Sequence, residues 1–171
     1  ARLGLMVAFI GVCGDDLFGR FMLDEMKMRG IDTSAVIIDP DRSTGLTVIL
    51  NKRNDRAMLT HPGAISDLRA ENVTDDLLRQ SRHLHVASYF LQTTLQPSLS
   101  NLFRRAHALG LTTSLDTNWD PSGQWKDVSK LLSLTDVFLP NENEAISITG
   151  ARTGGQALKQ LGKLTGIVAM K

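Results

Sequence analysis

The sequence places an amide and a carboxylate three residues apart, directly after a run that is typical of a buried strand. The segment PNENEAISITG, residues 140–150, follows the apolar run DVFL. If Asn141 begins a helix, Asn141 and Glu144 lie one turn apart on the same face. There an amide and a carboxylate can hold the hydrated Mg²⁺ of a nucleotide. The alternative is an ordinary helix start, with Asn141 as the N-cap and Glu144 as its capping-box partner.

Two further predicted strand ends carry polar side chains. Ser88 and Tyr89 follow the run HLHVA, and Asp116 and Asn118 lie two apart after the run LTTSL. The carboxyl ends of parallel strands share one edge of a sheet, which is where ligands bind in α/β folds. Hydroxyl-rich ligands need such donors and acceptors beside an aromatic face. The alternatives are that Asp116 and Asn118 form a turn before Pro121 and that Tyr89 serves packing.

These segments belong to a chain in which strand and helix patterns alternate. Such alternation predicts parallel crossovers, and therefore an α/β fold with a doubly wound, mostly parallel sheet flanked by helices. The predicted strands are 7–12, 83–88, 111–115, 136–139 and 167–170, and the predicted helices are 17–29, 97–109, 125–134, one that begins at Asn141, and 154–164. Shorter helical patterns cover DLRAENV and DDLLRQS, the second with Thr74 as its N-cap.

Residues 36–60 break this alternation. AVII, GLTVIL and RAMLT are short β-type runs separated by DPDRS and NKRND, with no helix between them. This pattern is typical of a small antiparallel meander. We therefore expect residues 1–35 and 61–171 to form the α/β part and residues 36–60 to be a β insertion.

The composition argues against several classes of partner. The 19 basic and 18 acidic residues nearly cancel, so no net field favours nucleic acid or an anionic membrane. The longest apolar run, residues 3–12, is interrupted by glycines and is too short to cross a bilayer. The single cysteine, Cys13, excludes an intrachain disulfide, and the cytoplasm is the expected compartment.

Two other pairs of residues could suggest metal binding. Asp15 and Asp16 are adjacent carboxylates, but they are better explained as a turn residue and the N-cap of the next helix. His83 and His85 are expected on the same face of a strand, without a third ligand nearby in the sequence. We interpret both histidines as structural.

Four strings taken together resemble the ribokinase-like (PfkB) carbohydrate kinases, in the order in which that family has them. They are GVCGDDLFGR, RSTGLTVIL, HPGAI and PNENEAISITG. The resemblance implies a ribokinase-like fold and phosphoryl transfer from ATP to a sugar hydroxyl, with Mg²⁺ at the phosphates. It also allows a monovalent cation as a further cofactor. In this family the insertion, here residues 36–60, serves as a lid over the sugar.

On the nucleotide side, the resemblance assigns three residues. Asn141 and Glu144 match the family's Asn-x-x-Glu, which places the magnesium ion and its waters. Lys171 lies just before the expected glycine turn of the nucleotide site. The resemblance therefore implies ATP contacts at Asn141 and Lys171 and metal contacts at Asn141 and Glu144.

On the acceptor side, the match is mixed. Asp116, Asn118 and Trp125 match the Asp-x-Asn-x-Arg…Trp string of relatives that phosphorylate keto-acid sugars, and Asp120 stands where the arginine would be. An aspartate there would repel a carboxylated sugar, which favours a neutral sugar or a nucleoside. Ser88 falls where ribokinases have a glutamate that contacts the substrate, so that contact is expected to be altered.

Two elements of the family pattern do not occur in these 171 residues: the Gly-Ala-Gly-Asp signature, with its catalytic base, and the early Asp and Gly-Gly pair. We therefore expect an internal part of a kinase, without turnover on its own. The alternatives are a catalytically inactive sugar- or nucleotide-binding regulatory protein of the same fold, and a nucleoside kinase. An unpaired edge of the lid would favour a homodimer. The sugar itself is not predicted.

Overall fold

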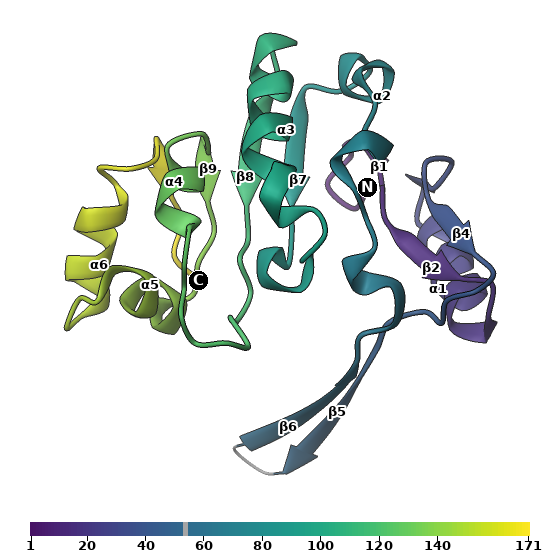
Figure 1. Cartoon of the computed structure of the whole chain (residues 1–171), viewed down its shortest axis with the longest axis horizontal. Coiled ribbons are helices and arrows are strands. Elements are labelled where there is room, and N and C mark those ends of the chain that lie inside the picture. The colour runs from purple at the N-terminus through teal and green to yellow at the C-terminus, as the bar shows by residue number, and fades with distance from the viewer. Residues whose placement is uncertain (53–54) are drawn as a thin grey trace. The chain divides into compact units, whose positions relative to one another are not determined.

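The computed structural model describes residues 1–52 and 55–171 as an α/β chain whose strand pairs are mostly parallel (Figure 1). The chain forms two compact units, residues 1–68 and 69–171. Within the described residues, no helix is both long enough and apolar enough to cross a membrane.

The first unit begins with two pairs of short parallel strands around one helix. Strand β1 (Val7–Ala8) pairs with β3 (Ile31–Asp32), and β2 (Val12–Gly14) pairs with β4 (Ile37–Asp39). Helix α1 (Leu17–Met28) follows β2. Asp16 is its N-cap and accepts a hydrogen bond from the backbone N–H of Gly19 at 2.8 Å. The predicted helix and its N-cap are confirmed.

The prediction of one continuous buried strand over residues 7–12 is wrong. The segment forms two strands whose partner changes between them, since Phe9 N–H donates to Asp32 O while Ile37 N–H donates to Gly11 O. Both residues of β1 are exposed, and the ring of Phe9 folds over Gly11. A short apolar run does not reveal such a change of partner, because the partners are distant in sequence.

The inserted segment is a two-stranded hairpin rather than a three-stranded meander. Strand β5 (Leu46–Lys52) pairs with β6 (Asp55–His61) in antiparallel register, while β4 pairs in parallel with β2. The prediction of a three-stranded meander is therefore wrong in one strand, because within the described residues β4 does not pair with the hairpin. Within the expected turn NKRND, residues 53–54 lie outside the described residues. The short 3-10 helix η1 (Gly63–Ser66) follows the hairpin.

The second unit is built on a four-stranded parallel sheet. Its order is β10 (Ile167–Val168), β9 (Val137–Phe138), β8 (Thr112–Leu115), β7 (His83–Val86). The helices α3 (Gln96–Ala108), α4 (Val128–Leu132), α5 (Glu142–Thr149) and α6 (Gly154–Leu161) connect or follow these strands (Figure 1). The alternation predicted from the sequence is confirmed for this unit.

Before β7 the chain forms shorter helices. DLRAENV gives only the 3-10 helix η2 (Ala70–Asn72), in which Asn72 Oδ1 accepts the N–H of Arg69 at 2.9 Å. Helix α2 (Asp75–Arg79) begins at Thr74 as predicted. After β7 comes a further 3-10 helix, η3 (Tyr89–Leu91).

The core of this unit lies between α3 and the sheet. Leu99, Leu102 and Phe103 of α3 and Leu115 of β8 are buried almost completely. Each such side chain contributes about 1.5–3 kcal/mol relative to an exposed position. This packing holds the sheet rigid and so fixes the positions of the loops that follow its strands.

Candidate functional site

The segments that follow the four parallel strands meet at one edge of the second unit. The N–H groups of Tyr89 and Phe90, after β7, donate to the carbonyls of Asp116 and Thr117, after β8, each at 3.4 Å. The N–H of Lys171, after β10, donates to the carbonyl of Pro140, after β9, at 2.9 Å. The structure thus brings to one edge all the residues that the sequence suggested: Ser88, Tyr89, Asp116, Asn118, Asn141, Glu144 and Lys171.

Asn141 and Glu144 form a complete capping box at the start of α5. Asn141 Oδ1 accepts the N–H of Glu144 at 2.9 Å, and Glu144 Oε2 accepts the N–H of Asn141 at 3.0 Å. Asn141 Nδ2 also donates to Glu144 Oε1 at 2.7 Å. The capping interpretation is therefore confirmed, and it orients the amide and the carboxylate toward each other.

This geometry leaves Glu144 able to accept hydrogen bonds from the waters of a hydrated magnesium ion. Glu144 is 3% exposed and both its oxygens are engaged by Asn141. A carboxylate offers about four lone-pair sites, so each oxygen keeps one acceptor position for a water bound to the ion. Among residues 1–52 and 55–171, no group of three or more His, Cys, Asp or Glu side chains is arranged to hold a metal.

Asp116 and Lys171 form an ion pair that connects the ends of β8 and β10. Lys171 Nζ lies 2.5 Å from Asp116 Oδ2, and Asp116 Oδ1 accepts the N–H of Asn118 at 3.1 Å. The lysine side chain is 56% exposed and the aspartate side chain 27%. A carboxylate can accept from a sugar hydroxyl and an ammonium can bind a phosphate, so the pair joins the two kinds of group that a kinase needs. No local pattern around either residue predicts this pairing.

Ser88 and Asn118 share an unusual backbone conformation. Both have φ of 56°, in the left-handed region, which asparagine tolerates and serine adopts less readily. Ser88 precedes η3 without capping it through its side chain. The two left-handed residues turn the chain sharply as it leaves β7 and β8.

Beside these turns, four aromatic rings form a chain of edge-to-face contacts. The centroids of Tyr89 and Phe90, Phe90 and Trp125, and Trp125 and Trp119 are 5.0, 5.2 and 5.1 Å apart, each pair edge-to-face. Tyr89 is buried, and burial, with Asp127 and Asp120 nearby, raises the pKa of its hydroxyl. Trp119 is 53% exposed. Sequence reasoning missed Trp119, although its position next to Asn118 was a usable signal.

Asp120 does not present its carboxylate to a ligand. It is 4% exposed and accepts the N–H groups of Ser122 at 2.8 Å and Trp125 at 2.7 Å, as well as the Ser122 hydroxyl. Burial opposes its ionisation, but these bonds outweigh burial and lower the pKa of Asp120. The expectation that Asp120 would repel an acidic sugar therefore loses its basis.

The two histidines of β7 bond to β8. His83 Nδ1 lies 2.7 Å from Thr112 Oγ1, and both His83 Nε2 and His85 Nδ1 lie 2.7 Å from Ser114 Oγ. Burial, set against the nearby Asp116, lowers the pKa of His85. These bonds support the structural interpretation of both residues.

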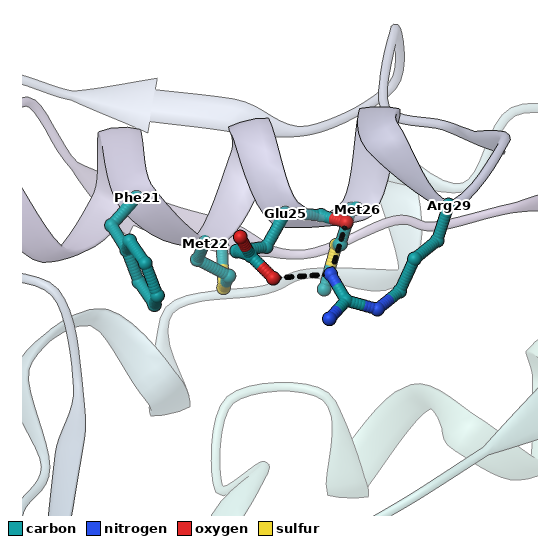
Figure 2. A pocket seen from close by; sticks show the side chains of 5 residues that line it. All are labelled: Phe21, Met22, Glu25, Met26 and Arg29. Atoms are coloured by element: carbon teal, nitrogen blue, oxygen red, sulfur yellow. Dashed lines mark hydrogen bonds and ion pairs between the residues drawn. The ribbon is translucent and has the colours of Figure 1, made fainter.

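A hollow in the first unit contains none of the predicted site residues. Five side chains of α1 line it: Phe21, Met22, Glu25, Met26 and Arg29 (Figure 2). Glu25 and Arg29 form an ion pair across one turn of the helix (Figure 2). The remainder of the lining is apolar, so the hollow offers little to a phosphate or a sugar.

The chain is similar to known proteins over nearly its whole length. The model of a family described as "pfkB family carbohydrate kinase" matches residues 1–170. The chain is 32% identical over 174 residues to a fructokinase of Vibrio alginolyticus, an alignment that covers 94% of this chain and 55% of that protein. It is 30% identical over 191 residues to a 2-dehydro-3-deoxygluconokinase of Bacillus subtilis (strain 168), covering 100% of this chain and 57% of that protein. The chain thus spans about half the length of these curated relatives.

A solved structure has the same fold. The structure of a putative ribokinase II from E. coli in complex with ATP and Mg²⁺ superimposes with a TM-score of 0.83. The alignment covers 99% of this chain and 58% of that chain, at 21% sequence identity. At that identity the likeness concerns the fold alone.

Proposed function

Since this chain belongs to the pfkB family of carbohydrate kinases, we propose that it is part of an ATP-dependent kinase that phosphorylates a hydroxyl of a sugar. The observation that carries the proposal is the convergence of the carboxyl ends of β7, β8, β9 and β10, with the Asp116–Lys171 pair at that edge. A ribokinase-like, doubly wound arrangement of the whole protein is part of the same proposal.

The acceptor is proposed to lie against the ends of β7 and β8. Asp116 and Asn118 offer a carboxylate and an amide for sugar hydroxyls, next to Ser88 and Tyr89. Asp116 O and Thr117 O hold the η3 segment against this loop, which keeps those groups at a fixed separation. Fixed positioning is the main contribution that a protein makes to phosphoryl transfer.

The nucleotide is proposed to lie against the ends of β9 and β10. Lys171 supplies a positive charge for the phosphates, and Asn141 and Glu144 supply acceptors for the waters of a hydrated magnesium ion. The ion, when bound, neutralises charge on the phosphates. Lys171 can move from Asp116 to a phosphate, which frees the carboxylate for the acceptor hydroxyl.

The β5–β6 hairpin is proposed to act as a lid, with residues 36–60 as the insertion that carries it. A lid excludes water from the reacting groups. A two-stranded hairpin is marginally stable alone, and its outer edges can pair with another strand. We therefore also propose a homodimer formed through the hairpin. Separately, we propose a cytoplasmic location, with neither nucleic acid nor membrane as a partner.

Two alternatives differ from this proposal, the first in lacking turnover and the second in the acceptor that is phosphorylated. The first is a catalytically inactive sugar- or nucleotide-binding regulatory protein of the same fold, which would bind its ligand without turnover. The second is a nucleoside kinase of the same fold. It would bind ATP in the same place, and the base of its nucleoside would lie against the rings of Tyr89, Phe90, Trp125 and Trp119. The three differ in which acceptor, if any, is consumed.

The test combines calorimetric titration with Mg²⁺–ATP and an ADP-release assay with Mg²⁺, ATP and a panel of neutral sugars, keto-acid sugars and nucleosides. It should be run on the 171 residues and on a longer protein that contains them. We expect the 171 residues to bind Mg²⁺–ATP without turnover and the longer protein to turn over a sugar. Binding without turnover by both would favour the regulatory alternative, and no binding by either would contradict the proposal.

A further inference from the structure

Asp16 contacts two segments that are far apart in sequence. Its Oδ1 accepts the N–H of Gly19 at 2.8 Å, in the first turn of α1, and the hydroxyl of Thr44 at 2.7 Å. Its Oδ2 accepts the N–H of Thr44 at 2.7 Å. Thr44 lies two residues before β5. One carboxylate therefore caps the helix and also holds the entry to the hairpin.

The backbone N–H and the hydroxyl of Thr44 are both engaged in hydrogen bonds at this contact. It is 7% exposed, and its Oγ1 accepts the N–H of Gly14 at 2.9 Å while its hydroxyl proton goes to Asp16. The Thr44 N–H and hydroxyl stabilise the charged form of Asp16 together with the N–H of Gly19, and they lower the pKa of Asp16 to about 2. The carboxylate is therefore ionised at any pH near neutrality.

The backbones at this point approach too closely for side chains. A Cβ on Gly14 would lie 2.3 Å from Arg42 O and 2.8 Å from Thr44 N. A Cβ on Gly19 would lie 2.2 Å from Gly14 O and 2.8 Å from Thr44 Oγ1. The two glycines thus let the turn before α1 and the strand entry meet at hydrogen-bonding distance.

The other end of the hairpin is tied to the first end. Ser43 Oγ lies 2.8 Å from His61 Nε2, at the end of β6. Arg42 donates to Asp67 Oδ2 at 2.7 Å and to Gly63 O at 3.1 Å, both beyond the hairpin. Among the hydrogen bonds of residues 1–52 and 55–171, those that join the hairpin entry to the N-cap of α1 come from Thr44.

We propose that Asp16 is a positioning residue that fixes the orientation of the β5–β6 hairpin relative to α1 by binding Thr44. A segment held at its root loses less freedom when it closes on a ligand, so binding costs less entropy. Its value for catalysis rests on the lid role proposed above. The orientation itself does not depend on that role.

Asp16→Ser separates the two tasks of this carboxylate. Serine is a good N-cap, so its hydroxyl can still accept the N–H of Gly19. It has no second oxygen to bind Thr44. Asp15→Ser is the matched control, because Asp15 is the neighbouring acidic residue and pairs only with the exposed Arg20 at 2.7 Å among the contacts described. Thr44→Val removes the hydroxyl alone, and Thr44→Ser restores it.

The measurement is residual dipolar coupling of backbone amides in the hairpin and in α1, together with amide hydrogen exchange. In the native chain and in Asp15→Ser, both elements should fit one alignment tensor. In Asp16→Ser, the hairpin couplings should fall by at least half and no longer fit the tensor of α1. Exchange at Thr44 should rise at least tenfold while exchange at Leu23, inside α1, stays unchanged.

Two results would overturn the proposal. Hairpin couplings of Asp16→Ser that still fit the tensor of α1 would mean that other contacts hold the hairpin. Equal loss of protection at Thr44 and Leu23 would mean that Asp16 acts only as a helix cap. Thr44→Val keeps the N–H bond to Asp16 Oδ2 and should reproduce part of the loosening, and Thr44→Ser should reverse it. Because no step uses a substrate, these results stand whether or not the protein phosphorylates a sugar; if it does, Asp16→Ser should raise KM for the sugar more than it lowers kcat.

Discussion

At the scale of single residues, Asp116 is placed to contribute more to binding than to stability. Its partner Lys171 is largely exposed, and exposed ion pairs contribute about 0–1 kcal/mol to folding. A hydrogen bond from a ligand hydroxyl to a carboxylate contributes about 1.5–3 kcal/mol. We expect Asp116→Asn to weaken binding of the acceptor sugar at least tenfold while the free energy of unfolding changes by under about 1 kcal/mol. Calorimetric titration and urea unfolding measure the two quantities.

A matched control is Asp127→Asn, which replaces another carboxylate of the same unit by a neutral amide. Asp127 pairs with Lys130 at 3.0 Å, and both side chains are exposed. It should change neither affinity nor stability appreciably. Equal loss of affinity in the two variants would indicate a general effect of charge, and Asp116 would then have no specific contact with the sugar.

Asp136 provides a pH-dependent contribution to stability. Its carboxylate accepts the N–H of Thr113 at 2.6 Å and contacts His107 Nε2 at 3.0 Å. Burial opposes its ionisation, but the bonds from Thr113 and His107 prevail and lower the pKa of Asp136. The stabilisation is therefore complete above the unfolded pKa of about 3.9 and is lost as the pH falls through the lower folded value. Asp136→Asn should destabilise the chain at pH 6 and progressively less below about pH 4, measured by urea unfolding. A difference that stays constant down to pH 2.5 would contradict this assignment.

At the scale of elements, α5 shows how a helix start and a ligand site can share the same atoms. Replacing an N-cap asparagine by alanine costs about 0.5–2 kcal/mol, whereas serine preserves most of the cap. Serine lacks the Nδ2 group that orients Glu144. We expect Asn141→Ala to lose stability and Asn141→Ser to recover it, while both lose affinity for Mg²⁺–ATP in calorimetric titration. If affinity follows stability across the two variants, the pair is only a cap.

The elements that could be predicted from sequence are those fixed by neighbours along the chain. The N-caps Asp16, Thr74 and Asn141 act on residues three positions away, so their signals lie within a single short segment. The failures concern strand partners. The segment 7–12 divides because its two halves pair with β3 and β4, and β4 pairs with β2 rather than with β5. Partners of this kind are set by tertiary packing and leave little trace in the local pattern.

The same distinction applies to the candidate site. Its residues were predictable because parallel strands bring their carboxyl ends to one edge. Their pairing was not. The bond between Asp116 and Lys171 joins positions 55 residues apart. No local sequence pattern around either residue predicts it. Asp120 is intermediate, because the turn pattern Asp-Pro-Ser-Gly could have indicated that its carboxylate accepts from the loop backbone.

At the scale of the whole molecule, the two compact units should respond to different ligands. The proposed nucleotide contacts, Asn141, Glu144 and Lys171, belong to the unit 69–171, and the hairpin belongs to the unit 1–68. We expect Mg²⁺–ATP alone to slow amide exchange in the segments after β9 and β10 and to leave residues 1–68 unchanged. In a longer protein that turns over, adding the acceptor sugar should extend the protection to β5 and β6 if the hairpin is the lid proposed above. Hydrogen exchange followed by mass spectrometry resolves these peptides. Protection of the α1 hollow by Mg²⁺–ATP, with none at the strand ends, would place the nucleotide elsewhere and remove the basis of the proposed site.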